Sequence, residues 1–135
     1  MMSDRSVLID TSIWIEYFRG KNHQFLSVVD VLLDEDRVVN VDLVCAELYR
    51  GARSEKEIRF LEQHFSAIPS LQVPVDVWRL VGKFSFQLAK KGYLPHLVDA
   101  YIAFTAIEHN VTLFTKDRDF QHMARLGPLK LYQLK

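Results

Sequence analysis

Cysteine is almost absent from this sequence. Cys45 is the only cysteine among 135 residues, so no disulfide bond can form within the chain. We therefore expect the protein in a reducing compartment, the cytoplasm. No histidine follows Cys45 at helical spacing, and we expect its side chain to be a small buried apolar group rather than a nucleophile.

Long hydrophobic runs are also missing. The longest early run spans residues 7–18 and is interrupted by Asp10 and Glu16. Such a run is too short and too charged to span a bilayer, and it lacks the basic start and the small-residue cleavage site of a signal peptide. We therefore expect no contact with a membrane.

The sequence also lacks an excess of either positive or negative charge. The chain carries 17 basic and 17 acidic residues, whereas a general coat for nucleic acid would show a strong basic excess. Binding to nucleic acid would therefore depend on local basic patches and on metal ions that cancel acidic charge. Composition alone does not point to RNA.

Repeats, low-complexity tracts and Pro/Gly-rich linkers are absent too, which predicts a single domain over residues 1–135. Apolar residues make up 49% of the chain and charged residues 25%, which is typical of an ordered globular protein. This length is sufficient to bury a hydrophobic core.

Short apolar runs alternate with longer runs of helical spacing. The short runs predict strands at residues 7–10, 38–41, 71–73, 111–115 and 129–134. The longer runs predict helices between them, with Asp42 as one N-cap and a capping box from Ser54 to Glu57. This order predicts an α/β fold, a three-layer α/β/α sandwich whose mainly parallel sheet has about five strands.

Acidic residues stand just after the predicted strands. Asp10 ends the first strand, Asp117 and Asp119 follow the fourth, and Glu47 lies in the helix that leaves the second. Asp99 opens the helix that leads back to the fourth strand. Because ligands of open parallel sheets bind outside the carboxyl ends of the strands, we expect these carboxylates to converge on one rim.

A cluster of carboxylates predicts a metal site. Like charges in one cleft repel and raise each other's pKa, and a divalent cation such as Mg²⁺ or Mn²⁺ removes this penalty. Zinc is not indicated, because the five histidines are scattered without ligand spacing. One or two such ions could activate a water molecule for hydrolysis of a phosphodiester bond, with no covalent nucleophile from the protein.

Each acid also has a purely structural interpretation. Asp10 could cap a helix, Asp99 could favour a helix N-terminus, and Glu47 could be solvated. Asp117 and Asp119 could be turn formers. These alternatives stay open for each residue alone, although Asp10 ends a wholly apolar run. Together they would require four coincidences.

Four segments resemble, in order, the four motifs of PIN domains, with spacings similar to those of VapC-type toxins. They are Leu-Ile-Asp-Thr-Ser-Ile-Trp at 8–14, Glu-Leu-Tyr-Arg-Gly at 47–51, Leu-Val-Asp-Ala-Tyr-Ile-Ala at 97–103 and Leu-Phe-Thr-Lys-Asp-Arg-Asp-Phe at 113–120. The resemblance implies an endoribonuclease dependent on Mg²⁺ or Mn²⁺, the toxin of a type II toxin–antitoxin pair. It also implies a homodimer and a cognate antitoxin whose C-terminal segment lies across the active-site groove.

The same resemblance assigns roles to individual residues. It implies catalytic or metal-binding roles for Asp10, Glu47, Asp99 and Asp117, and hydroxyl supports at Thr11, Ser12 and Thr115. The fourth motif varies in the family, so Asp119 is a candidate to share or replace Asp117. Basic residues near the motifs could hold RNA phosphates, or they could pair with Glu55 or Asp119 as solvated charges; they are Arg50, Arg53, Lys116 and Arg118.

Three alternatives compete with an active nuclease. A PIN-like domain kept only as a protein-interaction module would have lost one or more rim acids, yet all four positions are filled. A phosphatase with an aspartyl nucleophile needs a second aspartate where Ser12 stands. A receiver domain needs an adjacent acidic pair after its first strand, and none is present. The active nuclease ranks first and the interaction module second.

Overall fold

The fold is built around a small parallel sheet. A computed structural model describes residues 5–134, so residues 1–4 and 135 of the predicted domain lie outside it. The strand order is β2-β1-β3, with Leu8 paired to Val39 on one side and to Leu113 on the other. The strands are β1 (Val7–Ile9), β2 (Val38–Val39) and β3 (Thr112–Phe114). All of β1 is buried, as expected of a parallel strand covered on both faces.

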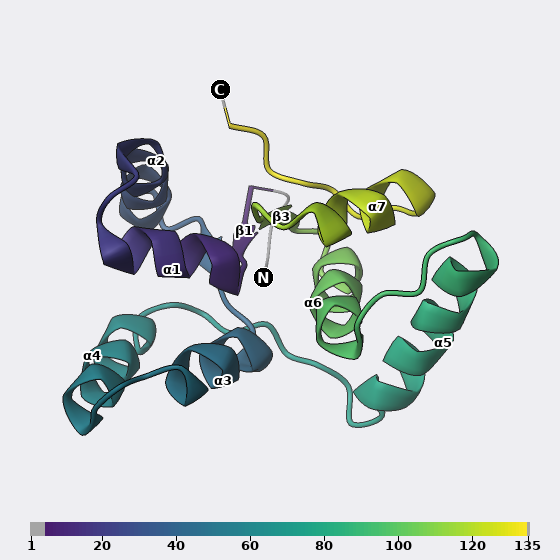
Figure 1. Cartoon of the computed structure of the whole chain (residues 1–135), viewed down its shortest axis with the longest axis horizontal. Coiled ribbons are helices and arrows are strands. Elements are labelled where there is room, and N and C mark those ends of the chain that lie inside the picture. Colours follow the sequence, from purple (N-terminus) through teal and green to yellow (C-terminus); the bar gives the residue numbers. More distant parts are fainter. Residues whose placement is uncertain (1–4, 135) are drawn as a thin grey trace.

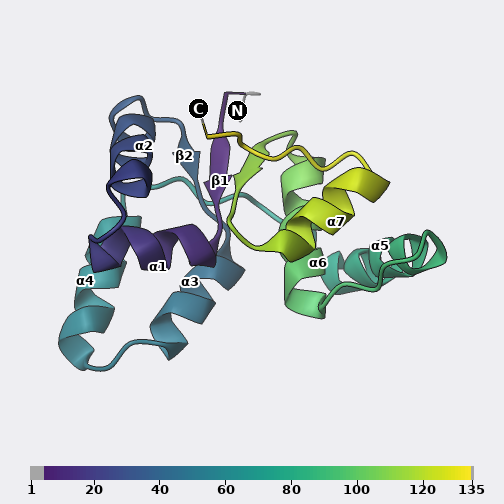
Figure 2. The same ribbon diagram turned by 45° about the horizontal axis from the view of Figure 1, so that its top comes forward.

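Seven helices cover this sheet in the described part of the chain. Figures 1 and 2 show α1 to α4 gathered on one side of the strands and α5 to α7 on the other. The predicted α/β/α sandwich is therefore confirmed. The helices are α1 (Thr11–Arg19), α2 (His23–Asp34), α3 (Asp42–Arg50), α4 (Glu55–Phe65), α5 (Val77–Lys90), α6 (Leu97–Glu108) and α7 (Arg118–Leu126).

Local sequence signals explain several helix ends. Asp10 is the N-cap of α1 and accepts the N–H of Ser12 at 3.4 Å. Gly20 ends α1 with a φ of 69°, a left-handed conformation that glycine adopts without strain. The predicted cap at Ser54 is present, because its hydroxyl accepts the N–H of Glu57 at 3.1 Å. The Glu57 carboxylate turns back to the N–H of Arg53 at 3.0 Å.

The predicted count of five strands is wrong for the described residues, which contain three. The predicted strand at 71–73 is reduced to one bridge between Ser70 and Asn40, and that at 129–134 to one bridge between Leu131 and Leu113. Both segments flank the sheet where strands were expected. Pro69 and Pro74 enclose the first segment and cannot donate to a ladder, so regular pairing does not extend.

Two smaller predictions also need correction. Asp42 does not cap α3: Val41 is the N-cap position, and the Asp42 carboxylate accepts the Tyr101 hydroxyl at 2.8 Å. Cys45 is half-buried rather than buried, and its sulfur accepts the side-chain N–H of Asn40 at 2.8 Å. In both cases a polar partner from another segment determines where the side chain lies.

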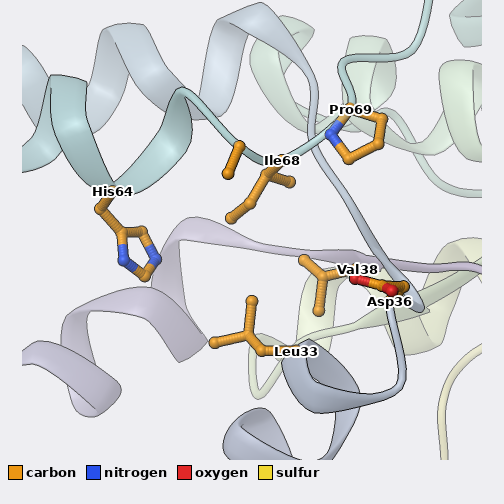
Figure 3. Close-up of a pocket in the computed structure, with 7 residues that line it drawn as sticks. Leu33, Asp36, Val38, His64, Ile68 and Pro69 are labelled. Carbon is orange, nitrogen blue, oxygen red and sulfur yellow. The ribbon is translucent and has the colours of Figure 1, made fainter.

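An aromatic cluster joins α1 to α4. Trp14 is fully buried, and its ring centroid lies 5.0 Å from that of His64 and 5.1 Å from that of Phe65. His64 also lines a pocket of about 420 Å³ beside Leu33 and Val38 (Figure 3). Its Nε2 atom is buried without a hydrogen-bond partner among the described residues, and burial lowers the pKa of the ring. None of the predicted site residues lines this pocket.

Among the described residues, no helix combines the length and the apolar character needed to cross a membrane.

Candidate active site

The Asp10 carboxylate lies at the carboxyl edge of the sheet, in a network of hydroxyl groups. The main-chain N–H of Asp10 donates to the carbonyl of Phe114 at 2.9 Å, which continues the β1–β3 pairing. Its side chain is 5% exposed, and the Oδ2 atom accepts the hydroxyls of Ser12 at 2.8 Å and Thr115 at 2.9 Å. These two hydroxyls lie 3.3 Å apart. The network therefore fixes the orientation of the Asp10 carboxylate.

Glu47 reaches this edge from α3. Its Oε1 atom accepts the hydroxyl of Thr11 at 2.7 Å, and Thr11 directly follows Asp10. All three predicted hydroxyl supports thus contact predicted acids, Thr11 on Glu47 and the other two on Asp10. Glu47 is not part of the tight carboxylate group described next.

Asp99, Asp117 and Asp119 form the tightest carboxylate group in the described chain. One carboxylate oxygen from each lies within 4.8 Å of the other two, and all three residues are half-buried. Asp99 is in the first turn of α6, whereas Asp117 caps α7 and accepts the N–H of Asp119 at 3.0 Å. The two helices therefore bring Asp117 and Asp119 together opposite Asp99. Asp117, whose structural interpretation was a turn former, is instead the N-cap of α7 and also a member of the cluster.

Unfavourable charge is concentrated at Asp99. Burial raises the pKa of its carboxyl to about 6, and the negative charges of Asp117, Asp10 and Asp119 add to this increase, with His96 opposing it. The negative charge of Asp10 therefore contributes to the raised pKa of Asp99. Burial also raises the pKa of Asp10, against the hydrogen bonds from Ser12 and Thr115 that lower it. The protein holds these carboxylates together at an electrostatic cost.

Two residues near the cluster were not predicted from the sequence. Burial raises the pKa of Tyr93 to about 12, with the charge of Asp119 and a hydrogen bond to it adding to the increase. Tyr93 comes from the loop between α5 and α6, where no spacing rule would have identified it. His96 precedes Asp99 by three residues at the N-terminus of α6, and this helical spacing is a signal that could have been used.

The four basic residues predicted to contact phosphates differ in their ion pairs. Lys116 lies 3.2 Å from Glu16, measured between Nζ and Oε1, so its ion pair is with neither Glu55 nor Asp119. The other three basic residues are exposed, and within residues 5–134 none of them forms an ion pair; they are Arg50, Arg53 and Arg118.

A groove of about 580 Å³ lies between α1, α3 and α4, and Glu47 is one of its lining residues. Its walls include the apolar side chains of Phe18 and Phe60, and the latter is 55% exposed. Arg19 and Arg53 also line it. The groove also contains Glu57, so it offers apolar surface with two arginines and two glutamates, of which Glu47 is one of the predicted acids.

The residues present fit a hard divalent cation. The cluster offers three carboxylate oxygens and no sulfur or nitrogen ligand, a donor set that suits Mg²⁺ or Mn²⁺ rather than zinc. A cation there would also remove the repulsion that raises the pKa of Asp99. The fold and the site together define a class: an α/β domain with an acidic site at the carboxyl edge of its parallel sheet.

Comparisons with known proteins agree with this class. The PIN domain family matches residues 7–126. The chain is 30% identical to VapC ribonuclease Mb1587 of Mycobacterium bovis over 128 residues, and this alignment covers 92% of this chain and 96% of the relative. Ribonuclease VapC1 of Methanocaldococcus jannaschii is 27% identical over 130 residues, or 96% of this chain and 88% of the relative. The solved structure of VapBC-1 from nontypeable Haemophilus influenzae is similar with a TM-score of 0.76 and 26% identity, covering 95% of this chain and 97% of that one.

The chain therefore belongs to the PIN-domain family and, within it, to the VapC branch.

Proposed function

We propose that this protein is an endoribonuclease that depends on Mg²⁺ or Mn²⁺ and acts as a toxin neutralised by a cognate antitoxin. The observation that carries the proposal is the group of Asp99, Asp117 and Asp119 beside the buried Asp10, at the carboxyl edge of the sheet. Support for RNA as the substrate comes from relatives that are named ribonucleases and match most of this chain.

The metal would be held by carboxylate oxygens of the cluster together with Asp10. Asp99, Asp117 and Asp119 supply three oxygens within 4.8 Å of one another. The hydroxyls of Ser12 and Thr115 occupy Oδ2 of Asp10, so they orient the carboxylate for its neighbours. When bound, the cation supplies Lewis-acid activation of water and charge stabilisation for phosphodiester hydrolysis.

The remaining groups position the substrate and hold protons. Glu47, fixed by Thr11, is the acid on the groove side of the site and can accept a proton from an approaching water molecule. Arg50, Arg53 and Arg118 are free of ion pairs within the described chain, which leaves them able to contact RNA phosphates. Exclusion of bulk water is only partial, because all three cluster residues are half-buried.

The antitoxin is proposed from two lines of support. The similar structure from Haemophilus influenzae is of VapBC-1, and the groove beside Glu47 combines apolar walls with two arginines and two glutamates. A partner segment with apolar side chains and charges of both signs would fit this groove and cover Glu47. We also propose, from the family, that residues 1–135 form one domain that assembles as a homodimer in the cytoplasm.

The test is cleavage of a structured RNA mixture that includes transfer RNA, by the purified chain without antitoxin. Discrete fragments should form with Mg²⁺ or Mn²⁺ and disappear with EDTA and in Asp10→Asn. The matched control is Asp34→Asn, which removes an exposed acid at the end of α2, outside the site. Wild-type cleavage by Asp10→Asn would contradict the role given to that residue.

A protein-interaction module without catalysis is the second candidate. It predicts that Mn²⁺ does not bind in a calorimetric titration and that no RNA is cut. Binding of Mn²⁺ that is lost in Asp99→Asn, together with cleavage, would exclude this module.

A further inference from the structure

Glu16 lies near the acidic site and has no role in the proposed function. It follows Ser12 by one turn of α1, and its side chain is only 18% exposed. The Oε1 atom lies 3.2 Å from Nζ of Lys116 and 3.5 Å from Nη1 of Arg19. The pair with Arg19 stays within α1, whereas the pair with Lys116 joins α1 to the loop that follows β3.

Lys116 is held to α1 at two points. Its main-chain N–H donates to the hydroxyl of Ser12 at 3.2 Å, and its ammonium group pairs with Glu16. Ser12 and Glu16 are four residues apart and so lie on one face of the helix. The lysine is therefore fixed along this face.

The neighbours of Lys116 carry the chemistry of the site. Thr115 donates its hydroxyl to Asp10 at 2.9 Å, and Asp117 belongs to the carboxylate cluster. The N–H of Asp117 donates to the Thr115 hydroxyl at 3.0 Å, which links the two residues directly. A displacement of this loop would change the separation between Asp10 and the cluster.

We propose that Glu16 is a positioning residue: through its ion pair with Lys116 it holds the loop at 115–117 so that Asp117 and Asp119 meet Asp10 and Asp99. This inference deepens the proposed function and rests on it for its effect on catalysis. Among the ion pairs within residues 5–134, this is the one that connects α1 with the loop after β3. Glu16 is 18% exposed and Lys116 is 49% exposed, so solvent screens this pair in part.

The inference differs from a direct phosphate contact by Lys116, which the sequence predicts. A lysine that binds substrate raises KM when it is replaced, independently of Glu16. A lysine that acts only as the partner of Glu16 lowers kcat, and replacing both residues does no more harm than replacing one. A double-mutant cycle therefore separates the two roles.

The variants are Glu16→Gln, Lys116→Met and their combination, with Lys116→Arg as the conservative replacement. The matched control is Asp76→Asn, which breaks the Asp76–Arg79 pair at the start of α5. We expect each single variant to lower kcat about five-fold with KM unchanged, the change that a pair of ~1 kcal/mol gives. The double variant should match the singles, and Lys116→Arg should retain most of the activity.

Hydrogen exchange provides a readout that does not depend on catalysis. The N–H groups of Lys116 and Asp117 donate to Ser12 and Thr115, and they should exchange several-fold faster in Glu16→Gln than in Asp76→Asn. Unchanged exchange at both amides, or additive effects with a raised KM in Lys116→Met, would overturn the inference. If the wild-type chain cuts no RNA, the proposed function fails, and hydrogen exchange alone still decides whether Glu16 holds the loop.

Discussion

Replacing Asp99 by asparagine should stabilise the protein while removing the metal-dependent cleavage that we propose for it. Asp99 lies opposite Asp117 and Asp119, and burial together with these charges raises the pKa of its carboxyl to about 6. Asparagine has nearly the same shape and no charge. The substitution therefore removes the repulsion and leaves the packing around α6 unchanged.

The size of the effect follows from this pKa. The ordinary value is 3.8, so the increase to about 6 corresponds to ~3 kcal/mol at most. Asp99 is half-buried and partly screened by solvent, which reduces the figure to ~1.5 kcal/mol. For a chain of this length such a gain raises Tm by about 5 °C.

The stabilisation by Asp99→Asn should depend on pH. The pKa of Asp99 is higher in the folded than in the unfolded chain, so its protonated form favours folding. This contribution is fully present below about pH 4 and is lost as the pH rises through about 6. The gain from Asp99→Asn should therefore be largest near neutral pH and vanish in acid.

Thermal unfolding in EDTA, followed across this pH range, measures the difference between the variant and the wild-type chain. Asp34→Asn is again the control and should show no such pH-dependent gain. Addition of Mn²⁺ should reverse the order, because the ion stabilises the wild-type cluster more than one lacking Asp99. A variant no more stable than wild type near neutral pH, or a gain of equal size at every pH, would refute the electrostatic reasoning.

Three further predictions concern single side chains. Burial lowers the pKa of His64, so the folded chain loses stability as the pH falls below about 6.5. In His64→Phe the Tm should fall less over this pH range than in the wild-type chain. Parallel Tm curves for variant and wild type between neutral and mildly acid pH would contradict this prediction. Ser12→Ala removes the hydroxyl that donates to the Asp10 carboxylate and should lower the cleavage rate about ten-fold. It should also move the acid limb of the pH–rate profile to higher pH, since this hydrogen bond lowers the pKa of Asp10. Tyr101→Phe removes the hydrogen bond to Asp42 and should cost ~1 kcal/mol in urea unfolding with activity unchanged; an equal loss of activity would show that this contact affects the site.

The arrangement of acids could be predicted because it depends on one rule of parallel sheets. Asp10 follows β1 and Asp117 follows β3, and the carboxyl ends of these strands meet at one edge. Asp99 was predicted from its place at the start of a helix that returns to the sheet, and the structure brings its carboxylate to those of Asp117 and Asp119. In each case a local boundary and the topology were enough.

Other features depend on contacts between distant segments, which spacing along the chain does not reveal. Tyr93 reaches Asp119 from a loop, and Lys116 pairs with Glu16, one hundred positions earlier in the chain. The outer strands were overestimated for a similar reason: their apolar residues suggested ladders, but pairing depends on the neighbouring segment and on the prolines beside it.

Helix α6 differs from α7 in how deeply it is embedded, and both carry members of the cluster. Six residues of α6 are buried, whereas α7 buries Phe120 and Met123. Local unfolding begins where few apolar contacts hold an element, so α7 should detach at a lower free energy than the rest of the domain. Detachment would carry Asp119 away from Asp99 while the sheet stayed intact. Heat would therefore inactivate the protein reversibly before it melts, and the temperature at which activity is lost would report on one short helix.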